Sequence, residues 1–297
     1  MISFDQAYQY INWSHNPTLD ENFDHFGTLT TNLVTPTLTI GLSDWWNASF
    51  NQIIGHRYMT WGQNAISKHH RDEGSNTDYD NAIGGYLGDR SITISYLLLN
   101  TGRGAGPRLF FTSGFIIPSK NVLTSDPFFL NEGSIENHRH FSMSQGAYKF
   151  IFENQFFVKR KLDPIFFGTS FRIEKTLNEN EFGLRASDNY ILSLSSYFSK
   201  LKLFKGNLLT SIILNYSSEA SWHDIPSPNS KSFLFIPGIG YTFNRTLGAI
   251  SINIQKPFSI LGALAGTPDY LNEQSDIYQI TIGYRRVLDY TIPWLYW

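Results

Sequence analysis

The feature that most constrains this chain is a strict alternation of apolar and polar residues over long segments. In residues 276–288, DIYQITIGYRRVL, alternate positions separate into an apolar set and a polar set: Tyr278, Ile280, Ile282 and Tyr284 against Gln279, Thr281, Gly283 and Arg285. Such alternation puts the two sets on opposite faces of a β-strand. One face therefore requires an apolar surrounding, whereas the other tolerates water.

The most informative segment of this kind is AYKFIFENQFFVKR, residues 147–160. Phe150, Phe152 and Phe156 share one face, while Glu153 and Gln155 share the other. A strand of this length exceeds the common length of strands in soluble sheets. Similar runs recur through the chain and predict about eleven strands, and the N-terminal segment could supply a twelfth.

Composition does not divide the chain into domains. We interpret residues 1–27 as a polar N-terminal segment and residues 28–297 as one β-barrel. Long polar segments occur at 64–88, 119–139, 219–231 and 262–275, and short polar turns join the other strands. Long loops at one end and tight turns at the other are typical of outer-membrane barrels.

The polar face of these strands indicates what surrounds the apolar face. Ser, Thr, Gly, Asn and Gln dominate the polar face, which is too hydrophilic for a dry core. Charged residues make up 16% of the chain, below the roughly 25% usual for soluble domains. In lipid, a sheet must close because unpaired backbone groups have no water to bind. We therefore predict an all-β fold, a transmembrane antiparallel β-barrel of about 12 strands. A secreted soluble β-protein that binds carbohydrate through exposed Trp and Tyr is the alternative.

Several classes of protein are disfavoured by the sequence. The formal net charge is −2, so the chain has no general basic field and no nucleic-acid partner is expected. The absence of cysteine excludes disulfides and thiolate metal sites. No window of about 18 apolar residues predicts a transmembrane helix. No signal peptide is visible either, so the numbering starts at a mature or recombinant end or the chain is not exported.

Five segments together suggest a family resemblance: TLTIGLSDWWN, GFIIPSKN, SFLFIPGIGYTF, ISINIQKPF and IYQITIGYRRVL. They resemble the outer-membrane barrels of the meta-pathway of phenol degradation, a group similar to porins and fatty-acid channels. The resemblance spans most of residues 30–288 and its motifs are loose. It implies a channel or transporter in the bacterial outer membrane, not an enzyme, that passes small solutes, hydrophobic ones among them. The implied partners are outer-membrane lipid and the solute.

Charged residues on the polar faces are candidates for setting selectivity. Lys149, Glu153, Arg172, Glu174 and Arg285 are all predicted to point into the lumen. Such charges can select solutes or pair with one another across the interior. Both uses are open from the sequence.

The loop KHHRDEGSNTDYDN could bind a divalent metal, the only cofactor hypothesis that the sequence offers. Imidazole and carboxylate side chains that suit a transition ion gather within it and on the strand before it: His56, His69, His70, Asp72, Asp78 and Asp80. The spacing does not match a calcium loop, because Leu87 occupies the position where a Glu ligand is required. The alternative is a solvated polar loop in which Asp and Asn stabilise turns.

A second alternative function is lipid hydrolysis. His140, Ser142 and Asn154 have a spacing similar to the His, Ser and Asn of outer-membrane phospholipase A, but the surrounding sequence does not match that enzyme. Nucleophilic catalysis needs the three side chains within hydrogen-bonding reach. If residues 140–158 form one strand, Ser142 and Asn154 lie roughly 40 Å apart, and the triad fails.

Overall fold

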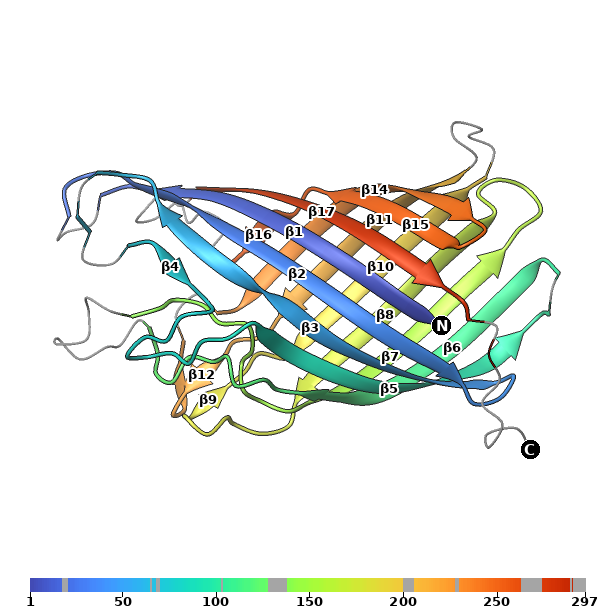
Figure 1. Ribbon diagram of the computed structural model, residues 1–297, viewed down its shortest axis with the longest axis horizontal. Coiled ribbons are helices and arrows are strands. Elements are labelled where there is room, and N and C mark those ends of the chain that lie inside the picture. Colours follow the sequence, from blue (N-terminus) through green and yellow to red (C-terminus); the bar gives the residue numbers. More distant parts are fainter. Residues whose placement is uncertain are drawn as a thin grey trace.

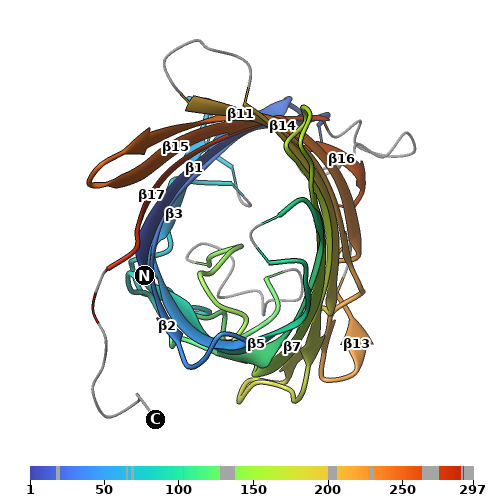
Figure 2. The same cartoon turned by 90° about the vertical axis from the view of Figure 1, so that its right-hand side faces the viewer.

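The computed structural model describes residues 1–17, 21–64, 66–67, 70–102, 104–127, 138–199, 206–227, 230–262, 274–288 and 290. Within these ranges no helix has the length and apolarity needed to cross a membrane. The described chain is built from β-strands that form a closed cylinder (Figures 1 and 2). The predicted all-β class is therefore confirmed.

Twelve long antiparallel strands close the barrel. Each pairs with its neighbours along the chain, and the first pairs with the last, from Ile2↔Arg286 to Ser14↔Gln274. The strands are β1 (Ile2–His15), β2 (His25–Gly41), β3 (Trp46–Trp61), β5 (Leu87–Asn100), β6 (Gly106–Ile117), β7 (Lys149–Lys159), β8 (Phe166–Thr176), β10 (Asn189–Phe198), β11 (Gly206–Ser217), β14 (Ser232–Arg245), β15 (Gly248–Gln255) and β17 (Gln274–Arg286). Each of the twelve long strands pairs on both sides, so closure removes the open edges that a flat sheet would have in lipid.

Side-chain exposure follows the alternation read from the sequence. On β17, Tyr278, Ile280 and Ile282 are 50%, 42% and 49% exposed on the outside of the barrel, whereas Ile277 is 3% exposed. On β7, Phe152 and Phe156 also face outward and Ile151 is fully buried. An apolar exterior this extensive would aggregate in water, but it matches the hydrocarbon core of a membrane. The apolar faces do not meet between two sheets, so the fold is not a soluble sandwich.

The barrel begins at Ile2 and not at residue 28. The segment 1–27, interpreted from sequence as a polar N-terminal extension, contributes β1 and the start of β2. The alternation of β1 is hard to recognise because Gln6 and Asn12 interrupt the face that carries Phe4 and Tyr8. The strand is stable in this position because it pairs on both sides, with β2 and with β17.

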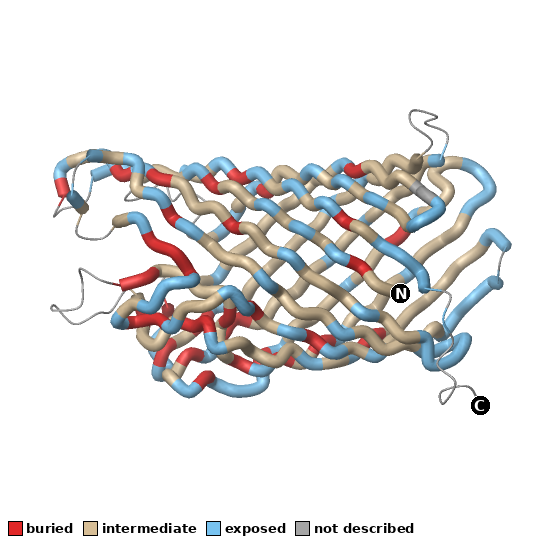
Figure 3. The backbone as a smooth tube through the Cα atoms, in the orientation of Figure 1, coloured by how far each residue is buried: buried red, intermediate tan, exposed pale blue. Residues whose placement is uncertain are grey.

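Long loops and short strands gather at one mouth of the barrel, opposite the end where the N-terminus lies (Figure 1). The short strands are β4 (Glu73–Gly74), β9 (Leu184–Arg185), β12 (Ser221–Trp222), β13 (Ile225–Pro226) and β16 (Phe258–Leu261). We define the cap as segments 70–86, 119–127 and 138–148, which fold into the interior at this mouth (Figure 2). Most buried positions also lie toward this end (Figure 3).

Aromatic residues near strand ends are predicted from the sequence to form belts at the membrane interfaces, namely Trp45, Trp46, Trp222, Trp294, Tyr296 and Trp297, but the described tryptophans do not all do so. Trp45 and Trp46 lie exposed at the short-turn end, where Trp46 packs on Tyr96 with ring centroids 4.5 Å apart. Trp222 instead is 6% exposed and packs with Leu184 and Ala220 among the loops of the other mouth. Trp294, Tyr296 and Trp297 lie outside the described residues. Trp222, which was assigned to the membrane interface, therefore belongs to a small hydrophobic core among the loops.

Candidate functional site: a capped lumen

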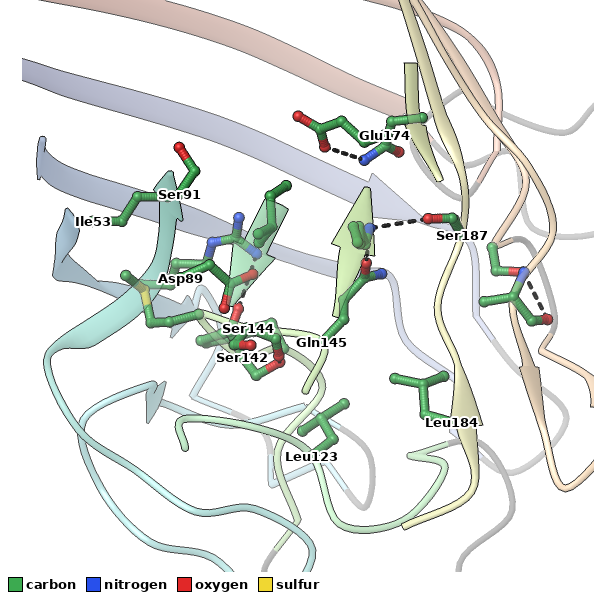
Figure 4. Close-up of a pocket in the computed structure, with 18 of the residues that line it drawn as sticks. Ile53, Asp89, Ser91, Leu123, Ser142, Ser144, Gln145, Glu174, Leu184 and Ser187 are labelled. Carbon is green, nitrogen blue, oxygen red and sulfur yellow. Dashed lines mark hydrogen bonds between the residues drawn. The ribbon is translucent and has the colours of Figure 1, made fainter. Parts of the chain in front are cut away.

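A cavity of about 650 Å³ lies between the cap and the inner wall of the barrel. Figure 4 shows Asp89 and Ser91 of β5 on the wall side and Ser142, Ser144 and Gln145 on the cap side. Since inward positions on the strands are polar, the wall supplies the polar part of this lining. The cavity therefore brings side chains of the inner wall and of the cap together at this mouth.

Apolar side chains reach the same cavity mainly from loops. Leu123, Phe141 and Met143 come from the cap, and Leu184 and Trp222 come from the neighbouring loops. Leu123 also packs against the small cluster formed by Leu184, Ala220 and Trp222. The cavity thus has a polar wall and a partly apolar roof, an arrangement typical of ligand-binding sites.

Charged residues of the wall form a paired network. The Arg172 guanidinium donates to Glu174 Oε1 through Nε at 2.9 Å and lies 3.5 Å from Glu153 Oε2 through Nη1. Glu174 also accepts from Asn189 Nδ2 at 3.1 Å, and Glu153 accepts from Gln155 Nε2 at 2.6 Å. Glu153 and Arg172 face each other directly across β7 and β8. Pairing of this kind leaves little uncompensated charge on this part of the wall.

The other two predicted lumen residues lie apart from this network. Lys149 is 4% exposed and its Nζ donates to Gln145 Oε1 at 2.7 Å and to the Ser187 carbonyl at 3.0 Å, so it anchors the cap to the wall. Arg285 lies on β17, across the barrel from β7 (Figure 2). Lys149, Arg172 and Glu174 line the cavity, and the role of all five residues in selectivity stays a prediction.

The cap is organised around Arg139, whose side chain is completely buried. Its guanidinium donates to the carbonyls of Ser75 at 3.0 Å, Thr77 at 2.8 Å and Ile83 at 2.9 Å. Burial lowers the pKa of Arg139 from its usual value, and nearby Glu73 opposes that shift. Arg139 therefore ties the segment after β3 to the segment before β7.

Two buried asparagines extend this polar core. Asn81 pairs with the Arg139 backbone in both directions, accepting from its N–H at 2.7 Å and donating to its carbonyl at 2.9 Å. Asn121 Nδ2 donates to the Ser75 and Gly85 carbonyls, both at 2.6 Å, and Asn121 Oδ1 accepts from the Met143 N–H at 3.0 Å. These contacts satisfy the backbone polar groups of irregular chain that would otherwise be costly to bury. Neither residue was singled out from the sequence, because the loops carry no periodicity that would place them.

Histidines form a hydrogen-bonded chain next to Arg139. Arg71 Nη2 lies 3.4 Å from His138 Nδ1, and the Nε2 atoms of His138 and His140 are 3.1 Å apart. His140 Nδ1 lies 3.1 Å from Glu73 Oε1, which belongs to a buried carboxylate. Since a guanidinium only donates and a carboxylate only accepts, protons placed on His138 Nε2 and His140 Nδ1 satisfy the whole chain.

Among the described residues the predicted metal-binding set does not gather into one group of ligands, although His56 and Asp72 line the same small pocket. His56 lies on the outward face of β3 opposite Asn32, Asp72 accepts from the Trp61 N–H at 2.8 Å, and Asp78 accepts from the Gly84 N–H at 2.7 Å. Asp80 is exposed, and His69 lies outside the described residues. The carboxylates thus stabilise turns, as the alternative interpretation proposed. His70 instead lies in a trio with His15 and His25.

The hydrolase triad also fails to form. Residues 140–148 are loop and β7 begins at Lys149, so the continuous strand 140–158 considered from the sequence does not exist. The Ser142 hydroxyl donates to the Ser144 carbonyl at 2.6 Å, and His140 pairs with Glu73. Asn154 shares the outward face of β7 with Phe152 and Phe156, away from the lumen. The three side chains therefore do not assemble a nucleophilic site.

The fold resembles that of known outer-membrane proteins. An outer membrane channel from Pseudomonas putida F1 superposes with a TM-score of 0.59 at 11% identity, covering 97% of this chain and 95% of that one. A FadL homologue from Pseudomonas aeruginosa covers 95% of this chain and 89% of its own at 9% identity, with a TM-score of 0.43. The translocator domain of the autotransporter NalP from Neisseria meningitidis, at 8% identity, covers 96% and 88% with a TM-score of 0.42.

No protein-family model matches the sequence. No curated protein matches it significantly either. The resemblance to the meta-pathway group therefore lacks support at the level of a sequence family, while the similarity of fold to an outer membrane channel stands. The class that the fold defines is the twelve-stranded membrane-spanning β-barrel, here with a cap that folds into its lumen.

Proposed function

We propose that this protein is a passive channel of the bacterial outer membrane for small solutes, including partly hydrophobic ones. The observation that carries the proposal is the cavity enclosed between a polar inner wall and the partly apolar cap of a lipid-facing barrel. A closed barrel with a polar interior is the common architecture of proteins that pass solutes through this membrane. The outer membrane channel of similar fold supports the same conclusion.

The lining predicts which solutes suit the channel. Arg172 is neutralised by Glu153 and Glu174, so strong selection by charge is not expected from this network. Leu123, Phe141 and Met143 offer apolar contact on the cap side of the cavity. A solute with one polar and one apolar part can satisfy both sides at once, whereas a large hydrophilic solute cannot.

Liposome swelling tests passage directly. Vesicles that contain the folded protein should swell in a pentose and in a hexose, and only slowly in a disaccharide. Phenyl glucoside should enter faster than its size predicts from the rates of the hexose and the disaccharide, because its ring can contact the apolar roof. The proposal fails if these vesicles swell no faster than protein-free vesicles in any of the sugars.

A matched pair of variants tests whether solutes use the cavity. Ser91 is 7% exposed, points inward on β5 and lines the cavity, whereas its neighbour Ile92 points outward and is 46% exposed. Ser91→Trp should fill the cavity and slow swelling. Ile92→Trp adds the same ring to the membrane face and should leave swelling unchanged. If vesicles with the two variants swell at the same rate, solutes do not pass through this cavity.

A further inference from the structure

Three histidines from separate elements meet at the capped mouth. His15 is the last residue of β1 and His25 is the first residue of β2, and they form a cross-strand pair with ring centroids 4.5 Å apart. His70 comes from the cap and lies 5.3 Å from His15 and 5.2 Å from His25, again between ring centroids. One ring nitrogen from each lies within 4.8 Å of the other two.

We propose that His15, His25 and His70 bind a divalent transition-metal ion, with Zn²⁺ as the ion to test, and that this ion fastens the cap to the barrel wall. Zinc–imidazole bonds of about 2.0–2.1 Å in tetrahedral geometry put the nitrogens of two ligands about 3.3 Å apart. The Nε2 atoms of His15 and His70 are 3.1 Å apart, close to that value. The site is distinct from the solute cavity and does not depend on the proposed channel function.

The surroundings of His15 fix the nitrogen that it would offer. His15 Nδ1 lies 2.7 Å from the Asn16 carbonyl oxygen, which can only accept a hydrogen bond. The proton therefore lies on Nδ1, and the Nε2 lone pair points toward His70. Metal-binding histidines commonly donate their second N–H to a backbone carbonyl or a carboxylate in this way.

Glu21 gives His25 an equivalent outer partner. Its Oε2 lies 3.2 Å from His25 Nε2, and both side chains are buried. The same oxygen accepts from the Ser67 hydroxyl at 2.7 Å, and Ser67 Oγ accepts from the His70 N–H at 2.9 Å. Glu21 and Ser67 thus link the β1–β2 loop to the segment that carries His70. Glu21 therefore contacts His25 from outside the group of three ligands.

Aromatic rings hold the trio in place. Phe23 stacks on His25 with centroids 5.0 Å apart, and Trp61 stacks on His70 at 5.3 Å. Trp13 contacts His70 at 4.8 Å. Rings fixed by packing lose little freedom when an ion binds, and the apolar surround limits competing water. His15 and His25 are held in place by the backbone pairing of β1 with β2. His70 lies on a loop, so its side chain is the one that moves when the ion is coordinated.

The donor set decides the class of ion. Three imidazole nitrogens suit Zn²⁺, Ni²⁺ and Cu²⁺, whereas Ca²⁺ and Mg²⁺ require mainly oxygen ligands. The nearby His138 and His140 pair has the same 3.1 Å spacing between Nε2 atoms, but its protons are already accounted for by Arg71 at one end and Glu73 at the other. That pair is therefore the internal control for the proposed site.

The test uses the full chain, folded in detergent and stripped with a chelator. Zn²⁺ binding is measured by competition with a chromophoric chelator, and Co²⁺ absorption reports the coordination geometry. Wild-type protein should take up one Zn²⁺ per chain, and Co²⁺ should give the visible bands of tetrahedral nitrogen coordination. His70→Ala and His15→Ala should weaken Zn²⁺ binding by more than about 100-fold, beyond the usual effect of an outer-shell partner. Glu21→Gln should weaken it less.

Two control histidines make the result decisive. His140→Ala and His223→Asn should bind Zn²⁺ as the wild type does, since His223 is exposed in the distant β12–β13 turn. Each variant is checked for a folded barrel by its heat-dependent mobility in gels, so loss of binding is not confused with unfolding. The proposal is overturned if the wild type takes up no Zn²⁺, if folded His70→Ala binds as tightly as the wild type, or if His140→Ala abolishes binding.

Discussion

The barrel wall and the cap are stabilised in opposite ways. In the wall, large apolar side chains such as Ile280 and Phe152 are exposed on the outside, where lipid takes the place of a protein core. In the cap, the most buried side chains include polar and charged groups, among them Arg139, Glu73 and Asn121. The wall obtains its order from the regular ladder of strands, whereas the cap obtains its order from specific hydrogen bonds to irregular backbone.

Because of this difference, the two regions should respond differently to substitution. Lipid packs against apolar side chains of any shape but does not solvate charge. The wall should therefore tolerate changes in side-chain size better than changes in polarity. A buried polar network tolerates neither, because each lost donor leaves an acceptor unsatisfied.

Removing the centre of the cap should have the largest effect. Arg139→Ala leaves the carbonyls of Ser75, Thr77 and Ile83 without the donor that they share, at a cost of about 3–5 kcal/mol in local stability. Amide hydrogen exchange in residues 74–84 should accelerate strongly, while exchange in the strands stays slow. Arg185→Ala, at an exposed arginine of β9 on the same mouth, is the control and should change neither. If amide exchange in residues 74–84 is as slow in Arg139→Ala as in the wild type, the cap is not held by this network.

A charge on the membrane face should have the next largest effect. Ile280→Arg places a guanidinium in the hydrocarbon and should lower the free energy of unfolding by about 2–4 kcal/mol. Thr281→Arg, one residue along β17, places the same group in the lumen and should be far milder. Urea unfolding of both variants in lipid vesicles measures the difference. Similar losses for the two positions would contradict the assignment of faces.

Breaking the ion network of the wall should have a moderate effect on stability and a clear effect on selectivity. Arg172→Gln removes the guanidinium between Glu153 and Glu174 and should cost about 1–2 kcal/mol. The two carboxylates then face the lumen without a cation, so the reversal potential in a salt gradient should move toward cation preference. Glu174→Gln should move it in the other direction. No movement in either variant would exclude this network from the ion pathway.

The smallest effect is expected at the solvated rim. Lys175 is exposed and pairs with Asp188, so Lys175→Ala should cost at most about 1 kcal/mol. Asp188 also accepts from the Thr176 N–H at 2.8 Å, and Asp188→Ala should therefore cost more than Lys175→Ala. Thermal unfolding of the two variants ranks them. The reverse ranking would indicate that the charge pair, and not the backbone contact, dominates here.

The same contrast explains what the sequence could predict. The alternation at Phe152 and Glu153 reveals the face of each wall residue because a strand has a period of two and the membrane makes one face apolar. The first strand was predicted only as a possible twelfth, because Gln6 and Asn12 break that pattern. The contacts of Arg139 could not be predicted, since they depend on how three loops fold against one another.

The partners of His70 could not be predicted from the sequence either. His70 was a candidate ligand from sequence, but the partners assigned to it were neighbours in the chain, including Asp72 and Asp78. The structure places it beside His15 and His25, which are 55 and 45 residues away along the chain. The antiparallel pairing of β1 with β2 and of β2 with β3 brings the ends of β1 and β2 beside the loop after β3, and no local pattern in the sequence carries that information.

The most direct test of the central claim is the environment of consecutive residues on one strand. Spin labels placed singly at positions 278 to 282, in protein reconstituted into lipid vesicles, report collision with oxygen, which concentrates in hydrocarbon, and with a water-soluble nickel chelate. Labels at 278, 280 and 282 should favour oxygen, and labels at 279 and 281 should favour the nickel chelate. Uniform accessibility along the five positions, or the opposite alternation, would contradict a barrel with lipid outside and water within.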